Sequence, residues 1–195
     1  MKLFLASHNQ GKLRELRALL APLPLEIESW RGALPAEAGE TLEANARVKA
    51  RTVAAATGAA ALGDDSGLEV DALGGAPGVR SARYAGDEGD PARNIAQLLD
   101  ALRGVPPERR GARFRCALCL VAPGRREILI EGQCRGTILE APRGGGGFGY
   151  DPVFFVREVG RAMAEMTQGE KNVVSHRGRA VRALRAELEK WWPCT

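Results

Sequence analysis

The chain has 195 residues, of which 45% are hydrophobic and 27% charged, and its formal net charge is +4. These values are typical of a globular chain that buries a sizeable core, and they exclude a disordered one. No apolar run approaches the ~20 residues that a membrane span requires, and the apolar run within residues 1–6 is too short for a secretory signal. We therefore expect a cytoplasmic protein without a membrane partner. Aromatic residues make up 5% and show no regular spacing, so we expect no stable nucleic-acid partner.

The first element is predicted to be a strand over residues 2–6, followed by a polar turn and a helix with leucines at helical spacing. Asn9 is a plausible N-cap of that helix. The free amides of its first turn, with Lys12 beside them, would form an anion site. The spacing is not that of a Walker P-loop. A second strand is expected over residues 25–28.

A long alanine-rich helix is predicted to begin after Thr41 and to end at Thr57-Gly58. Asn45 and Lys49 are four residues apart, so they share one face of it. These two side chains either face a functional site or are simply solvated.

Residues 61–71 consist of two short apolar runs around Asp64 and Asp65, which we expect at a turn between glycines. Two adjacent carboxylates repel each other, and a bound cation would relieve that repulsion. Hard oxygen ligands favour Mg²⁺, or Mn²⁺, over zinc. The alternative is a solvated surface turn.

The next segments predict a helix that starts at Asp90-Pro91, and an antiparallel hairpin of residues 112–122 and 126–135. Together with the preceding elements they indicate a mixed α/β sheet. Cys116 and Cys119 would point to opposite faces of the first hairpin strand, so a shared metal is not expected. All four cysteines are expected to be reduced packing residues.

Four consecutive glycines precede Phe148, Tyr150 and Asp151. Glycines in a row can be a flexible linker, but here they deliver a mobile ring beside a carboxylate, as base stacking with edge recognition requires. A last helix is expected after Ser175. It carries His176 and Arg177 in its first turn, where cations are unfavourable. We therefore expect an acceptor on a ligand to compensate Arg177.

Together these motifs resemble those of the inosine/xanthosine triphosphate pyrophosphatase family, the Ham1-like nucleotidases. The stretches that carry the resemblance span nearly the whole chain in family order: 7–12, 45–50, 64–68, 74–78, 81–84, 146–152 and 175–178. Ala44 departs from the family pattern, which has Glu at this position, and Glu43 lies one residue early. We therefore assign the second metal carboxylate to Glu37 in the preceding loop.

The resemblance implies an elongated mixed β-sheet with flanking helices in two lobes around a central cleft, forming a single domain over 1–195 that assembles as a homodimer. It implies hydrolysis of ITP, dITP and XTP to the monophosphate and pyrophosphate. Asp65 would be the proton acceptor, and Mg²⁺ would be held by Asp65, Glu37 and Asp64. The implied substrate contacts are Ser7, His8, Asn9, Lys12, Lys49, Ser66, Phe148, Gly149, Tyr150, Asp151, Lys171, His176 and Arg177.

Within that set, Ser7, Asn9 and Lys12 would bind the phosphates with help from Lys49 and Lys171. Arg177 and His176 would donate to the 6-oxo group of hypoxanthine or xanthine, which adenine lacks. Two alternatives remain: a Maf-like pyrophosphatase that acts on modified pyrimidines, and a nucleotide-binding protein that does not hydrolyse its ligand.

Overall fold

The structure is a computed structural model that describes residues 1–36, 39–86 and 89–190. Its described strands form one mixed sheet in the order β2-β1-β3-β5-β6-β7-β8, with β4 paired to β3. The strands are β1 Lys2–Ala6, β2 Glu26–Ser29, β3 Ala60–Val70, β4 Pro77–Gly78, β5 Gly111–Val121, β6 Ile128–Ile138, β7 Phe154–Val156 and β8 Arg161–Ala162. The α-helices are α1 Gln10–Leu20, α2 Leu42–Thr57, α3 Pro91–Ala101, α4 Gln168–Val174 and α5 His176–Glu189. The predicted mixed α/β class is confirmed.

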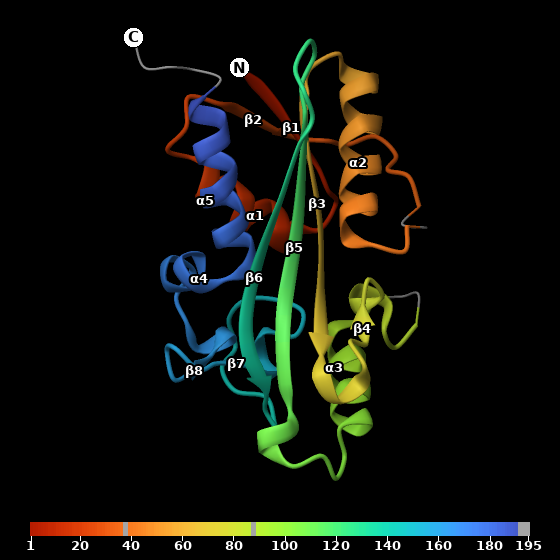
Figure 1. The fold of residues 1–195 in the computed structure, drawn as a ribbon, viewed down its shortest axis with the longest axis vertical. Coiled ribbons are helices and arrows are strands. Elements are labelled where there is room, and N and C mark those ends of the chain that lie inside the picture. The colour runs from red at the N-terminus through yellow and green to blue at the C-terminus, as the bar shows by residue number, and fades with distance from the viewer. Residues whose placement is uncertain (37–38, 87–88, 191–195) are drawn as a thin grey trace. The chain divides into compact units, whose positions relative to one another are not determined.

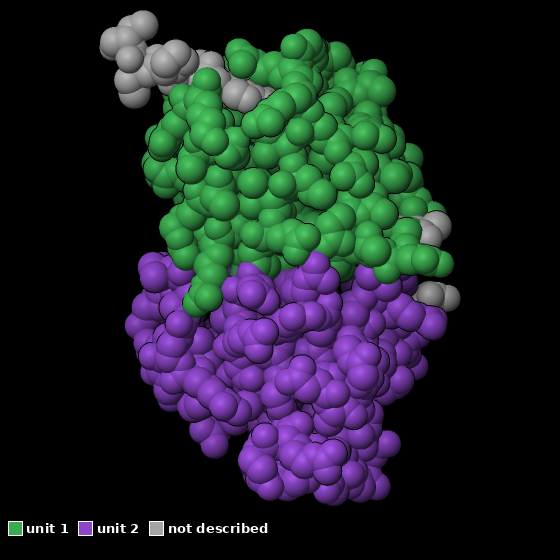
Figure 2. Space-filling view, in the orientation of Figure 1, with its two compact units in different colours: residues 1–65, 116–132, 176–195 green, residues 66–115, 133–175 purple. Residues whose placement is uncertain are grey.

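The chain divides into two compact units (Figure 2). Unit 1 consists of residues 1–65, 116–132 and 176–195, and unit 2 of residues 66–115 and 133–175. The boundary falls within β3, β5 and β6. Among the described residues, no helix combines the length and apolar character needed to cross a membrane.

In unit 1, β1 is paired in parallel with β2 on one side and with β3 on the other. Leu3 and Leu5 of β1 pack in a core with α1 and α5, whereas Ala6 packs on the opposite face with Val53 of α2. Helices α1 and α5 therefore cover one face of these strands and α2 covers the other (Figure 1). Such an order places a topological switch point at the carboxyl ends of β1 and β3, where open α/β sheets bind ligands.

The caps of both N-terminal helices are as predicted. The Lys12 amide donates to Asn9 Oδ1 at 3.0 Å, and the Ala44 amide donates to Thr41 Oγ1 at 3.1 Å. Helix α2 ends at Gly58, whose φ of +63° is readily adopted by glycine alone. Sequence chemistry therefore fixes where α1 and α2 begin.

In unit 2, the core joins apolar side chains of β3, β5, β6, β7 and α3. The Asp90 carboxylate caps α3 by accepting from the Ala92 amide at 2.8 Å, and Pro91 occupies the first turn. Strands β5 and β6 are neighbours joined by residues 122–127, a connection too short for parallel pairing. The predicted α3 and hairpin are confirmed.

One local prediction was wrong. Asp64 and Asp65 lie within the continuous strand β3 rather than at a turn. The flanking glycines, Gly63 and Gly67, are there because neighbouring backbone segments pack closely against them. A Cβ on Gly63 would lie 2.0 Å from Ala46 O, and one on Gly67 would lie 2.3 Å from Gly78 O. Residues 168–174, for which sequence analysis predicted no element, form α4, whose first turn is capped by Thr167.

The cysteine prediction agrees with the described part of the chain. Cys116, Cys119 and Cys134 are free and buried. Cys116 packs in the core beneath α1 and α5. Burial and the Glu127 carboxylate raise the pKa of Cys119 to about 12, so it is a protonated thiol. Cys194 lies outside the described residues.

Candidate active site

A buried ionic cluster lies in unit 1 where β3 meets helices α1, α2 and α5. At its centre are Asp64 and Asp65, which are 1% and 4% exposed. Lys12 Nζ, from the first turn of α1, lies 2.7 Å from Asp64 Oδ1 and 4.0 Å from Asp65 Oδ1. One ammonium group thus touches both members of the aspartate pair.

Asp64 is held from the other side by Arg177 at the start of α5. Arg177 Nε donates to Asp64 Oδ2 at 2.7 Å, and Nη1 donates to Glu15 Oε2 at 2.6 Å. Burial alone would raise the pKa of Asp64, but the charges of Arg177 and Lys12 outweigh it and hold that pKa well below its usual range. Asp64 is therefore an ionised partner of Arg177 at neutral pH.

Asp65 is held by the face of α2 that the sequence singled out. Lys49 Nζ lies 2.8 Å from Asp65 Oδ1, and Asn45 Nδ2 donates to Asp65 Oδ2 at 3.0 Å. Lys49 Nζ also donates to the main-chain oxygen of Asp64 at 3.2 Å. The interpretation of Asn45 and Lys49 as solvated side chains is excluded, since both are buried.

The described cluster is balanced in charge. The carboxylates of Asp64, Asp65 and Glu15 face the cations of Lys12, Lys49 and Arg177. Protein cations therefore relieve the repulsion that sequence analysis assigned to a metal ion.

Carboxylate oxygens nevertheless suit Mg²⁺, which commonly binds one or two protein carboxylates together with substrate phosphates. Within residues 1–36, 39–86 and 89–190, no group of three or more His, Cys, Asp or Glu residues could hold a metal. Glu37, the predicted second ligand, lies outside these residues. The carboxylate of Asp65 is a ligand type that Mg²⁺ accepts, and a magnesium site formed with Glu37 stays a prediction.

The predicted phosphate loop follows β1 at the switch point. Ser7 is 7% exposed and its Oγ accepts from the Asn9 amide at 3.2 Å, so the loop turns directly into α1. His8 is exposed, and its Nε2 lies 3.0 Å from Gly32 O. This loop brings Lys12 and the amides of a helix N-terminus beside the aspartates, an arrangement that favours anions.

A second group of predicted residues lies in unit 2. Asp151 is 3% exposed, accepts from the Phe148 amide at 2.8 Å and pairs with Lys171 of α4. Lys171 Nζ lies 4.7 Å from the centroid of the Phe148 ring, within cation–π range. Gly147 allows this approach, because a Cβ there would meet Asp151. The residue expected to carry a mobile ring is therefore held by Asp151 at its main chain and contacted by Lys171 at its ring.

Three roles predicted from sequence need correction. The Tyr150 ring belongs to the unit 2 core and its hydroxyl donates to Ser81 O at 2.8 Å, so it is structural. The ammonium group of Lys171, predicted to bind phosphate, forms an ion pair with Asp151. Arg177 is 0% exposed and already has protein acceptors in Asp64 and Glu15, so no ligand is needed to compensate its charge.

The remaining predicted substrate contacts differ in exposure. Ser66 is partly buried in β3, and His176 is 5% exposed at the first residue of α5. Gly149 adopts a φ of +62°, a left-handed conformation suited to glycine. Their contacts with substrate stay predictions.

Sequence reasoning missed Glu15 altogether and left the role of Asn45 open. Glu15 is 2% exposed, and it lies three residues after Lys12 on α1. That i,i+3 spacing was the available signal, because it places both charges on one helix face. Only the fold could supply the partner, Arg177, which is 162 residues away in sequence.

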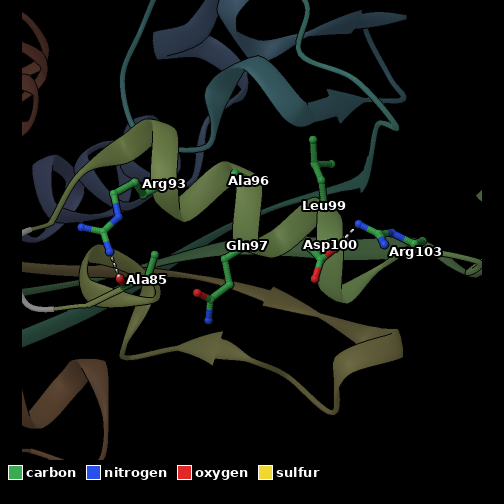
Figure 3. A pocket seen from close by; sticks show the side chains of 7 residues that line it. All are labelled: Ala85, Arg93, Ala96, Gln97, Leu99, Asp100 and Arg103. Carbon is green, nitrogen blue, oxygen red and sulfur yellow. Dashed lines mark hydrogen bonds and ion pairs between the residues drawn. The ribbon is translucent and has the colours of Figure 1, made fainter.

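A separate hollow of about 660 Å³ lies over α3 in unit 2 (Figure 3). Its charged side chains have partners nearby: Asp100 pairs with Arg103, and Arg93 donates to Ala85 O at 3.4 Å. It lacks the phosphate-binding loop and the paired aspartates, so we place the chemistry in the unit 1 cluster.

Known proteins resemble the chain over nearly its whole length. The model of the Ham1 family matches residues 3–187. A dITP/XTP pyrophosphatase from Bacillus licheniformis is 47% identical over 193 residues, which cover 97% of this chain and 98% of that protein. A dITP/XTP pyrophosphatase from Gloeobacter violaceus is 52% identical over 183 residues, which cover 93% of this chain and 91% of that protein. The structure of a HAM1 protein from Coxiella burnetii superposes with a TM-score of 0.88 at 39% identity, covering 97% of this chain and 99% of that one. The chain therefore belongs to the Ham1 family.

Proposed function

We propose that the protein hydrolyses non-standard purine nucleoside triphosphates, namely dITP, ITP and XTP, to the nucleoside monophosphate and pyrophosphate. The observation that carries this proposal is the position of Asp65. Its buried carboxylate is oriented by Lys49 and Asn45, beside Lys12 and the N-terminus of α1. A fixed carboxylate next to an anion-binding helix end can activate water against a bound phosphate. The relatives named dITP/XTP pyrophosphatase support the same reaction class.

In this mechanism Asp65 accepts the proton of the attacking water. Asn45 and Lys49 hold its two oxygens, so the carboxylate is preorganised before substrate arrives. With Asp65 and Glu37 as its ligands, Mg²⁺ would offset charge that develops on the leaving pyrophosphate.

Lys12 and Arg177 have different roles in the proposal because their exposures differ. The Lys12 side chain is 13% exposed, whereas that of Arg177 is 1% exposed. Lys12 can therefore share its ammonium group between Asp64 and an incoming phosphate. Arg177 stays with Asp64 and keeps the acidic strand in place.

The unit 2 group supplies base recognition in this proposal. Phe148 offers a stacking face, fixed by Asp151 and Lys171. A 6-oxo purine presents an acceptor where adenine presents an amino donor, so a site that donates to the base rejects adenine. His176 remains the candidate donor, since Arg177 is committed to Asp64 and Glu15 and Lys171 is paired with Asp151.

The test is pyrophosphate release from a panel of triphosphates with and without Mg²⁺. We expect release from ITP, dITP and XTP that requires Mg²⁺, and far less from ATP and GTP. Preferred hydrolysis of modified pyrimidine triphosphates would instead identify a Maf-like activity. Tight nucleotide binding without release would identify a non-hydrolysing binding protein.

The proposal also includes assembly as a homodimer and action in the cytoplasm without a stable nucleic-acid partner. Light scattering after gel filtration tests the dimer: a monomeric mass at micromolar concentration contradicts it.

A further inference from the structure

Unit 1 contains a hollow of about 410 Å³ beside the phosphate loop. It lies at the carboxyl ends of β1 and β2, on the side of α1 that carries Arg17. Its walls contain no carboxylate: the lining residues are Ser7, His8, Gln10, Leu13, Arg17, Ser29, Trp30 and Arg31. We call it the arginine hollow. Its polar lining contains two guanidinium groups beside the side chains of Ser7, His8, Gln10 and Ser29, so its charge favours an anion.

Both arginines also line an adjoining hollow that contains Glu28, but Glu28 pairs with Lys2. Arg17 Nη2 donates to Ser29 Oγ at 3.1 Å, which orients the guanidinium at the rim of the hollow. A guanidinium has five N–H donors in a planar fork, so this bond leaves others for phosphate oxygens. Arg31 is exposed on the segment that follows β2.

The opposite wall is a fixed aromatic ring. Trp30 Nε1 donates to Ala33 O at 3.0 Å, and the ring meets Phe4 edge-on with centroids 6.4 Å apart. Gly32 is needed for this arrangement, because a Cβ there would lie 2.3 Å from the Trp30 ring. The contact of His8 Nε2 with Gly32 O, at 3.0 Å, ties this wall to the phosphate loop.

Ser7 and His8 belong to both the phosphate loop and the arginine hollow. An anion in the hollow therefore lies next to an anion at the N-terminus of α1. We propose that the arginine hollow binds a diphosphate group through Arg17 and Arg31. This inference rests on the proposed function for the identity of its ligand. The diphosphate is either the terminal part of the bound triphosphate or the free pyrophosphate that the reaction releases.

The direct test is calorimetric binding of inorganic pyrophosphate to the wild-type protein and to the variants Arg17→Ala and Arg31→Ala. Each variant should weaken binding ~10- to 100-fold, the scale of a lost charge-assisted contact. Arg14→Ala is the matched control, because Arg14 is an exposed arginine of the same helix outside the hollow. It should bind pyrophosphate like the wild type. Equal affinity in all four proteins, or an equal loss in Arg14→Ala, overturns the proposal.

Kinetics then separate the two sources of the diphosphate. If the hollow holds the terminal phosphates of substrate, KM for dITP rises in both variants by a factor similar to the loss of pyrophosphate affinity. If it holds the free product, KM is unchanged while inhibition by added pyrophosphate is relieved. Because the binding assay needs no turnover, an inactive protein that still binds pyrophosphate through Arg17 and Arg31 contradicts the proposed reaction but not the hollow.

Discussion

Arg177 binds Asp64 through two donors, with Nε 2.7 Å from Oδ2 and Nη2 3.3 Å from Oδ1, and neither side chain is exposed to solvent beyond 1%. The two residues are 113 positions apart in sequence, so this bidentate pair joins α5 to β3. A buried charge that loses its partner is strongly destabilising, whereas a surface pair contributes little.

Arg177→Ala should therefore lower the free energy of unfolding by about 3–5 kcal/mol, since it leaves Asp64 buried beside a reduced set of cations. Turnover of dITP and of ATP should fall together. Urea denaturation measures the change in the free energy of unfolding, and steady-state kinetics with dITP and with ATP measure the change in turnover. Arg182→Ala, an exposed change on the same helix, serves as the control and should stay within about 0.5 kcal/mol. A selective loss of dITP turnover in a stable Arg177→Ala protein would return Arg177 to base recognition.

Glu15→Ala removes the second carboxylate that Arg177 contacts. We expect a smaller loss of about 1.5–3 kcal/mol, because Asp64 still holds the guanidinium. Glu15→Gln should recover part of it, since the amide oxygen accepts the same hydrogen bond without the charge. Urea denaturation of both variants measures these differences. If Glu15→Ala unfolds at the same urea concentration as the wild type, the Glu15–Arg177 ion pair does not contribute to stability.

The pKa of Asp64 predicts a specific dependence of stability on pH. Its folded-state pKa lies well below the value of 3.8 expected for a free side chain. Above about pH 5 both states are ionised, so the contribution of Asp64 is complete and constant. Below that pH the unfolded chain takes up the proton first, and the contribution falls by up to about 1.4 kcal/mol per pH unit.

Urea denaturation at pH 7, 5 and 3 tests this dependence. The difference in stability between the wild type and Asp64→Asn should be nearly the same at pH 7 and 5, and smaller at pH 3. A difference that stays constant or grows between pH 5 and 3 would mean that Arg177 and Lys12 do not lower the pKa of Asp64.

Lys12→Ala should weaken binding of triphosphate much more than binding of nucleoside. Its ammonium group lies beside the N-terminus of α1 and is the more exposed cation of the pair that contacts Asp64. Loss of a charge-assisted contact predicts a ~10- to 100-fold higher Kd for dITP in the absence of turnover, with inosine binding unchanged. Lys2→Ala removes an exposed lysine paired with Glu28 and is the control. Equal losses for dITP and inosine would remove Lys12 from phosphate binding.

Local chemistry explains which parts of this arrangement the sequence could predict. The caps at Asn9 and Thr41 and the shared face of Asn45 and Lys49 depend on residues within four positions of each other, and all were confirmed. The turn at Asp64 was wrong because a glycine that allows close approach of another strand or helix has the same sequence signature as a turn glycine.

Partners far apart in sequence were beyond prediction. Arg177 seemed to need an acceptor on a ligand because its first-turn position was unfavourable, but Asp64 and Glu15 supply that acceptor only in the folded chain. The same holds for Lys171, whose partner Asp151 is 20 residues away. The sequence showed that these charged side chains needed partners. Which residues pair with them depends on the topology of the sheet, which the sequence patterns did not reveal.

The most direct test of the account compares pyrophosphate release from dITP by the wild type and by Asp65→Asn, with Asp100→Asn as an exposed control on α3. The asparagine keeps the size of the side chain and one of its two acceptor oxygens, which Lys49 or Asn45 can still contact, but it cannot accept the proton of water. We predict Mg²⁺-dependent release by the wild type and the control, and kcat at least ~100-fold lower in Asp65→Asn with dITP binding retained. Near wild-type turnover by a folded Asp65→Asn protein would contradict the assignment of Asp65 as the catalytic base and, with it, the placement of the active site.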